Sequence, residues 1–122
     1  MANELTVQVY AALANGKLSE LFNPGTLTFD QSTLLAHAPV VVVGTSEEDL
    51  SLGDITTNGW VFMRNLDGTN YVTYGPKSGG VMVPWGRIEA GEVAAFRLEP
   101  GVIWRWVANT SSVKVKVLAL ND

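Results

Sequence analysis

The sequence predicts an all-β protein: a single-domain antiparallel β-sandwich over residues 1–122, jelly-roll-like, with an immunoglobulin-like sandwich as the alternative. Apolar and polar residues alternate with period 2 from end to end, as in half-buried strands. Turn signals recur at roughly the 8 to 12 residue spacing of sandwiches and barrels. None of the gaps between the expected strands is long enough for a helical crossover, so we expect antiparallel connections. A chain of 122 residues fits one such domain.

The first expected strands lie close together near the N-terminus. Leu5–Ala11 alternates between apolar and polar side chains and leads to the turn signal Asn15-Gly16. The segment 17–22 is expected to return from that turn as a second strand. Asn23-Pro24-Gly25 predicts another turn, followed by a third strand over 26–29, which is β-branched and aromatic.

The middle of the first half is less regular. Gln31–His37 is expected to be an extended connection, with one helical turn over 32–36 as the less favoured alternative. Val40–Val43 is a continuous apolar run, typical of a strand buried on both faces or paired tightly with a neighbour. Small and acidic residues over 44–54 indicate a solvated loop.

The second half is more regular. Asn58-Gly59 precedes an expected strand over 60–65, and Asp67-Gly68 leads into another over 70–74, so these two strands are predicted to form a hairpin. Breaks are expected at 75–76, 78–80, 89–91 and 100–101, and the strands that they separate are 81–87, 92–98 and 102–108.

The C-terminal segment has the clearest alternation. Val113, Val115, Val117 and Ala119 fall on one face, and two lysines, 114 and 116, fall on the other. We therefore expect a half-buried strand near the end of the fold.

The composition limits the classes of partner. Hydrophobic residues make up 47% of the chain and charged residues 16%, against about 25% in typical soluble domains, so few charges remain to cover the surface. We expect some apolar surface to be buried against another chain. The net charge is −4 and the eight basic residues are scattered, which argues against a nucleic-acid partner. The absence of cysteine excludes disulfides and thiolate metal sites.

The sequence shows no membrane or secretion signal. Its start has no basic segment followed by an apolar stretch, and the longest apolar runs fall far short of the ~20 residues that span a bilayer. We expect a soluble protein made in the cytoplasm, with no membrane partner.

No catalytic constellation is complete. The one histidine, His37, lies between alanines without a nucleophile-elbow pattern. The acidic run 47–49 lacks the ligand spacing and central glycine of a calcium loop. Asp54 and Asp67 lie in turn-like surroundings, although a pair of carboxylates acting on a sugar stays open. The glycines at 75–80 do not form a phosphate loop. We expect no catalytic residue, no metal and no cofactor.

The tryptophans are the most informative side chains. Trp104 and Trp106 share one face of an expected strand, and Arg105 lies on the other face with apolar neighbours. Burial on both sides follows, with one face in the core and the other available to a subunit contact that Arg105 would anchor. Alternatively, the tryptophans form a sugar-stacking platform. Trp85 could serve either role.

The second half also resembles a known group of proteins. The matching segments are Asn58–Asp67, Asn70–Val72, Ile88–Glu92, Arg97-Leu98 and Val113–Leu118, and together they span about half the chain. In their residue pattern and loop sequences they resemble small β-sandwich structural proteins encoded by tailed bacteriophages, such as capsid decoration (cement) proteins or minor virion proteins.

This resemblance implies a virion protein assembled in the host cytoplasm, without catalysis. A decoration protein stabilises the head shell, self-associates, commonly as a trimer, and binds the major capsid protein or other virion proteins. Connector and tail positions stay open, and the alternatives are a carbohydrate-binding or fibre-like module and, more distantly, a small hydrolase. Leu5–Ala11 and Val40–Val43 are the expected pairing segments. The candidate interface residues are Leu5, Val7, Val9, Val41, Val43, Trp85, Trp104, Arg105 and Trp106.

Overall fold

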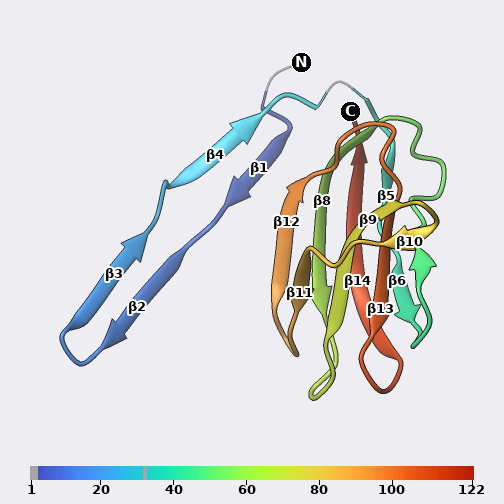
Figure 1. Cartoon of the computed structure of the whole chain (residues 1–122). Helices are drawn as coiled ribbons and strands as arrows, with labels where there is room; N and C mark the ends of the chain where they lie inside the picture. The colour runs from blue at the N-terminus through green and yellow to red at the C-terminus, as the bar shows by residue number, and fades with distance from the viewer. Residues whose placement is uncertain (1–2, 32) are drawn as a thin grey trace. The chain divides into compact units, whose positions relative to one another are not determined.

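The structure is a computed structural model that describes residues 3–31 and 33–122. The chain divides into two compact units, one ending at residue 34 and one spanning residues 35–122 (Figure 1). This division differs from the expected single sandwich over residues 1–122. Within the described residues, the strands of the first unit pair only with one another, and both five-stranded sheets belong to the second.

The first unit is a long two-stranded hairpin, hereafter the ribbon. Strand β1 (Leu5–Gln8) pairs antiparallel with β4 (Thr26–Phe29), and β2 (Ala11–Asn15) pairs antiparallel with β3 (Leu18–Phe22). The turn expected at Asn15-Gly16 is confirmed, because the β2–β3 ladder closes there and Gly16 has a φ of +61°. Glycine adopts this backbone conformation without the steric cost that other residues incur.

The turn expected at Asn23-Pro24-Gly25 is wrong. These three residues lie opposite Val9 and Tyr10 between the two ladders of the ribbon, and the chain keeps its direction through them. Three residues facing two is a bulge, and Gly25 accommodates it with a φ of +83° while its N–H donates to Asn23 Oδ1 at 3.1 Å. The same interruption divides the expected strand Leu5–Ala11 into β1 and β2.

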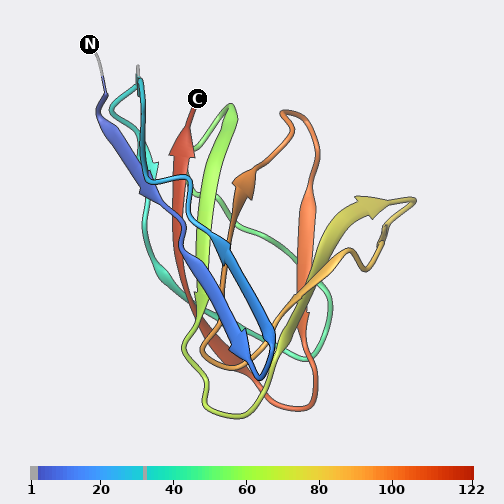
Figure 2. The same ribbon diagram turned by 90° about the vertical axis from the view of Figure 1, so that its left-hand side faces the viewer.

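The second unit is all-β. Its strands are β5 (Ala36–His37), β6 (Val40–Val43), β7 (Glu48–Asp49), β8 (Asn58–Asn65), β9 (Val72–Ser78), β10 (Val81–Met82), β11 (Gly86–Ile88), β12 (Val93–Arg97), β13 (Trp104–Ala108) and β14 (Val113–Asn121). They form two five-stranded antiparallel sheets packed as a sandwich, and Figure 2 shows β8 and β14 on one side of it and β9 and β13 on the other.

The strand order is that of a jelly roll. In one sheet the strand order is β12-β8-β14, and β5 and β6 pair with different stretches of the other edge of β14. In the other sheet the order is β9-β13-β7. Both β10 and β11 pair with the edge of β9 that β13 leaves free. If β5 and β6 are counted as one strand, and β10 and β11 as another, residues 35–122 contain eight strands. Numbered from 1 to 8 along the chain, they have the order 1-8-3-6 in one sheet and 2-7-4-5 in the other, which is the order of a jelly roll. The topology therefore favours the jelly roll over the immunoglobulin-like alternative.

The hairpin expected between residues 60–65 and 70–74 is wrong. Strand β8 pairs with β12 and β14, whereas β9 pairs with β13, β10 and β11 in the opposite sheet. Gly68 does not have the positive φ that a two-residue hairpin turn needs, and the Asp67 carboxylate instead accepts hydrogen bonds from the N–H groups of Thr69 and Asn70. The loop 66–71 therefore crosses between the sheets.

The β5–β6 segment follows one of the two expectations for Val40–Val43. Val43 is fully buried, but Val40 and Val42 are 54% and 57% exposed, so this strand is not buried on both faces. It pairs along one edge with β14. Upstream, residues 31 and 33–37 contain no helical turn, and Ser32 lies outside the described residues.

The hairpin after β9 contains two further differences from expectation. Gly75 and Pro76 lie inside β9 and do not break it. The strand expected over 81–87 is two strands, β10 and β11, because Trp85 and its two predecessors interrupt the ladder. Gly79 and Gly80, with φ of +62° and +81°, form the turn that joins β9 to β10.

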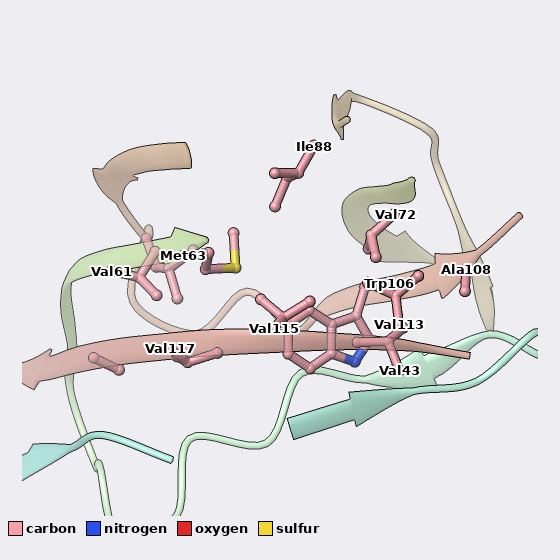
Figure 3. Packing of buried hydrophobic residues seen from close by; sticks show 12 residues of the cluster. Val43, Val61, Met63, Val72, Ile88, Trp106, Ala108, Val113, Val115 and Val117 are labelled. Carbon is pink, nitrogen blue, oxygen red and sulfur yellow. The ribbon is translucent and has the colours of Figure 1, made fainter. Parts of the chain in front are cut away.

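The core lies between the two sheets of residues 35–122. The indole of Trp106, 1% exposed, lies among valines of the facing sheet (Figure 3). The alternation expected for the C-terminal strand is confirmed, since Val113, Val115 and Val117 are fully buried. Burying one such side chain contributes about 1.5–3 kcal/mol, so this inner face is a large part of what holds the sandwich together.

Candidate functional site

Two of the groups that could have supported catalysis, His37 and Asp67, make contacts within the fold. His37 lies in β5, and its ring contacts Gly53 so closely that a Cβ at that glycine would be 2.5 Å from Nδ1. The two backbone N–H groups that donate to Asp67 hold the pKa of its carboxyl below the usual value, which is the behaviour of a turn-stabilising group. Asp54 is exposed in the loop before β8.

The acidic run 47–49 organises the edge of one sheet. Glu47 Oε1 accepts hydrogen bonds from Met82 N–H at 2.9 Å and Arg105 Nη1 at 3.2 Å. Glu48 Oε1 accepts from Gly44 N–H at 3.2 Å. Across residues 3–31 and 33–122, no group of three or more histidine, cysteine or acidic side chains is placed to hold a metal ion.

Arg105, a candidate subunit anchor, is engaged within its own chain. Its Nε donates to Asp49 Oδ1 at 2.8 Å, and its Nη1 also donates to Gly80 O at 2.9 Å. The hydrogen bond from Arg105 lowers the pKa of Asp49, and Lys77 Nζ, 3.9 Å from the same carboxylate oxygen, adds to that effect. Arg105 therefore joins β7, β13 and the β9–β10 turn.

The three candidate tryptophans have three different environments. Trp106 is in the core, Trp104 is partly buried against the core, and Trp85 is 64% exposed. The expectation that Trp104 and Trp106 share a face is confirmed, since both contact the core cluster. Trp106 cannot contact a partner without unfolding, so Trp85 is the tryptophan that the sandwich presents to solvent.

Trp85 belongs to an aromatic cluster at one side of the sandwich. Its ring packs edge-on against Trp104 at 5.6 Å between centroids, and also contacts Tyr74 and Phe96. Gly75 makes this packing possible, because a Cβ there would lie 1.8 Å from Val83 O. A shallow depression of about 240 Å³ beside Trp85 is lined by Thr73, Pro84, Gly86 and Arg87.

A second depression lies on the sandwich between the loop after β7 and the start of β13. Its volume is about 310 Å³, and apolar side chains such as Leu50, Leu52 and Ile55 line it together with Trp104. None of its lining residues is titratable. Its lining residues therefore supply no carboxylate, imidazole or amine that could act as an acid or base.

The other candidate interface residues divide between interior and surface. On β6, Val43 is buried and Val41 is partly buried against the core, whereas Val40 and Val42 face outward. In the ribbon, Val7 is 7% exposed, Leu5 is partly exposed and Val9 is 44% exposed.

Two surfaces expose several apolar side chains, and only Val40–Val43 of the second was an expected pairing segment. The first is the β2–β3 part of the ribbon, in which every residue is exposed, including Leu13, Leu18, Leu21 and Phe22 at 48–65%. Apolar residues on both strands beside Asn15-Gly16 were the signal for it. The second surface is the outer face of the β12-β8-β14-β6 sheet, where Val40, Val42 and Val93 are each more than half exposed.

No protein-family model matches this chain, and neither does any curated protein or solved structure. The arrangement of its own residues is therefore the basis for a function. Among the residues that the structure describes, no helix is long and apolar enough to cross a membrane.

Proposed function

We propose that this chain is a non-enzymatic structural protein that self-associates, and that it serves as a decoration protein on the head shell of a tailed bacteriophage. The observation that supports self-association is the exposed β2–β3 part of the ribbon. Leu21 and Phe22 are 65% and 60% exposed there, on strands that pair only with each other within residues 3–31 and 33–122.

An isolated two-stranded hairpin is marginally stable in water. Its apolar side chains gain free energy when another surface covers them, at roughly 25 cal/mol per Å² of apolar area. Contiguous exposed apolar surface of this kind marks protein interaction sites. The low charged fraction of 16% is consistent with the same role.

The phage virion enters this proposal through the resemblance of Asn58–Leu118 to small phage structural proteins. The jelly roll is compatible with that role, since viral capsid domains use the same architecture, as do lectins and cupins. Fold alone does not assign a function.

Self-association is tested by the solution mass of the full chain, measured by light scattering coupled to size exclusion at micromolar concentration. We expect a trimer, which Leu21→Lys with Phe22→Lys converts to monomer. The matched control is Leu34→Lys, because Leu34 is 98% exposed outside the strands. A monomeric unmodified chain refutes self-association.

The virion role is tested by immunogold electron microscopy of phage particles from the source, with antibody raised against this chain. Gold over the head shell supports a decoration protein. Gold over the tail moves the protein to another part of the virion and ends the decoration proposal. Particles without label refute the virion role altogether.

A second candidate function is carbohydrate binding, and Trp85 is the observation that favours it. An exposed indole beside Arg87 and a shallow depression can stack against a sugar ring while polar groups bind its hydroxyls. Titration of the chain with a panel of cell-surface oligosaccharides, followed by tryptophan fluorescence, tests it. A saturable shift that Trp85→Ala abolishes would establish this function, and an unresponsive spectrum would remove it.

A further inference from the structure

The outer face of the β12-β8-β14-β6 sheet combines apolar and basic side chains. These four strands lie side by side in the sandwich (Figure 1). Alternation along each strand directs one set of residues outward. That set comprises Val40, Val42, Asn58, Trp60, Phe62, Arg64, Val93, Ala95, Arg97, Lys114, Lys116 and Leu118. Four of the eight basic residues of the chain are therefore on one sheet face.

Acidic side chains are scarce on this face. None of the outward positions on these four strands is Asp or Glu, and the Asp122 carboxylate beside it pairs with Arg97 at 3.1 Å. Lys116 Nζ donates to Ala38 O. Lys114 lies opposite the exposed Val42 in the β6–β14 ladder. Two copies that met through this same face would place like charges together, which disfavours a symmetric contact.

The ribbon has the complementary character. Residues 3–34 contain Glu4, Glu20 and Asp30 against a single Lys17. Because Leu13 lies opposite Glu20 in the β2–β3 ladder, the Glu20 carboxylate shares a face with apolar side chains of both strands. Those neighbours are Leu13, Leu18 and Phe22, each about half exposed or more. The ribbon thus presents an acidic group within an apolar surface.

We propose that the β2–β3 part of the ribbon of one copy docks on the outer face of the β12-β8-β14-β6 sheet of a second copy, with Glu20 against Lys114. The apolar residues around Glu20 then cover Val40 and Val42, which a single copy leaves exposed. Such a contact joins two different patches, so it is heterologous and closes into a ring when its rotation permits. This inference rests on the self-association proposed above but not on the virion role.

Charge reversal tests the pair. Glu20→Lys and Lys114→Glu are each expected to weaken association at least about tenfold, and the double variant is expected to return to within about threefold of the unmodified chain. The measurement is analytical ultracentrifugation across a concentration series. Glu99→Lys makes the same change of charge at an exposed residue outside the strands of both surfaces, and it serves as the control.

Cross-linking separates docking between copies from docking within one chain. The sequence contains no cysteine, so Glu20→Cys and Lys114→Cys can be made in separate preparations. A short bismaleimide added to their mixture is expected to give a covalent heterodimer. The mixture of Glu20→Cys with Glu99→Cys is expected to give none.

The outcomes are distinct from those of the proposed function. Association that neither charge reversal alters, or a mixture that yields no heterodimer, overturns this docking contact while self-association stands. A monomeric unmodified chain overturns both. A chain that carries both Glu20→Cys and Lys114→Cys provides the remaining comparison. If it cross-links only within single chains, the contact between copies is overturned.

Discussion

Arg105 Nε and Asp49 Oδ1 are 2.8 Å apart, and this hydrogen bond joins strand β13 to the short edge strand β7. Because the pKa of Asp49 lies below its usual 3.8 in the folded chain, folding favours the deprotonated carboxylate. The stabilisation is complete above the pKa of the unfolded chain and is lost as the pH falls through the folded pKa.

We therefore expect Asp49→Asn to lower the melting temperature at pH 7, and its difference from the unmodified chain to shrink as the pH falls below about 4. Thermal unfolding followed by circular dichroism at several pH values measures this. Asp54→Asn, in the loop between β7 and β8, is the control. It should change neither the melting temperature at pH 7 nor the dependence of that temperature on pH. A difference that stays constant with pH would mean that Asp49 contributes through something other than its charge.

The Asn65 side chain is expected to tolerate no change in its hydrogen-bonding pattern. It is fully buried, its Nδ2 donates to Asn70 O and Ile88 O at 2.9 and 3.0 Å, and its Oδ1 accepts from Asp67 N–H at 2.8 Å. Asn65→Asp keeps the shape but places an acceptor against two carbonyl oxygens. Leaving such groups unsatisfied costs about 1–3 kcal/mol each, and more for a charged group.

Urea denaturation at pH 7 is the measurement for Asn65→Asp. Part of the loss should be recovered at lower pH, because a protonated carboxyl can again donate one hydrogen bond. Equal loss at both pH values would contradict this account.

Gly75 and Gly44 form a matched pair for backbone packing. Alanine at Gly75 would put its Cβ 1.8 Å from Val83 O, whereas Gly44 has nothing within 4 Å and no positive φ. Gly75→Ala is expected to cost about 1–3 kcal/mol or more and to disturb the packing of Trp85. Gly44→Ala should be nearly neutral. Chemical denaturation and tryptophan emission read both effects, and similar behaviour of the two variants would refute the close packing.

Substitutions of Trp106 and Trp85 are expected to have different effects on the free energy of unfolding. Trp106→Ala removes a side chain that is 1% exposed and is expected to cost about 3–5 kcal/mol. Trp85→Ala, at a 64% exposed position, should cost much less. Comparable losses in denaturant midpoint would show that Trp85 is part of the core.

The local sequence pattern was sufficient to predict several strands and turns. The alternation of Val113 to Ala119 predicted which face of β14 is buried, and Asn15-Gly16 predicted the ribbon tip, because both signals depend on residues close in sequence. For the same reason Thr26–Phe29 is a strand as expected. The all-β sandwich class follows from the sum of such signals.

The local sequence pattern could not predict which strands pair with each other. Each strand has two edges of similar hydrogen-bonding capacity, so the assignment of β8 and β9 to opposite sheets depends on long-range packing. The Asp67-Gly68 sequence fits a hairpin turn, but the buried Asn65 stabilises a crossing between the sheets.

The sequence by itself determined the strand alternation, most turns, the scarcity of charge and the absence of a complete catalytic motif, since all of these reside in composition or short-range pattern. Only the tertiary structure decided that the ribbon forms a unit of its own, that Arg105 bonds within its chain, and that Trp85 rather than Trp106 faces solvent. The physical reason is that exposure depends on which surfaces pack together, and residues distant in sequence supply those surfaces.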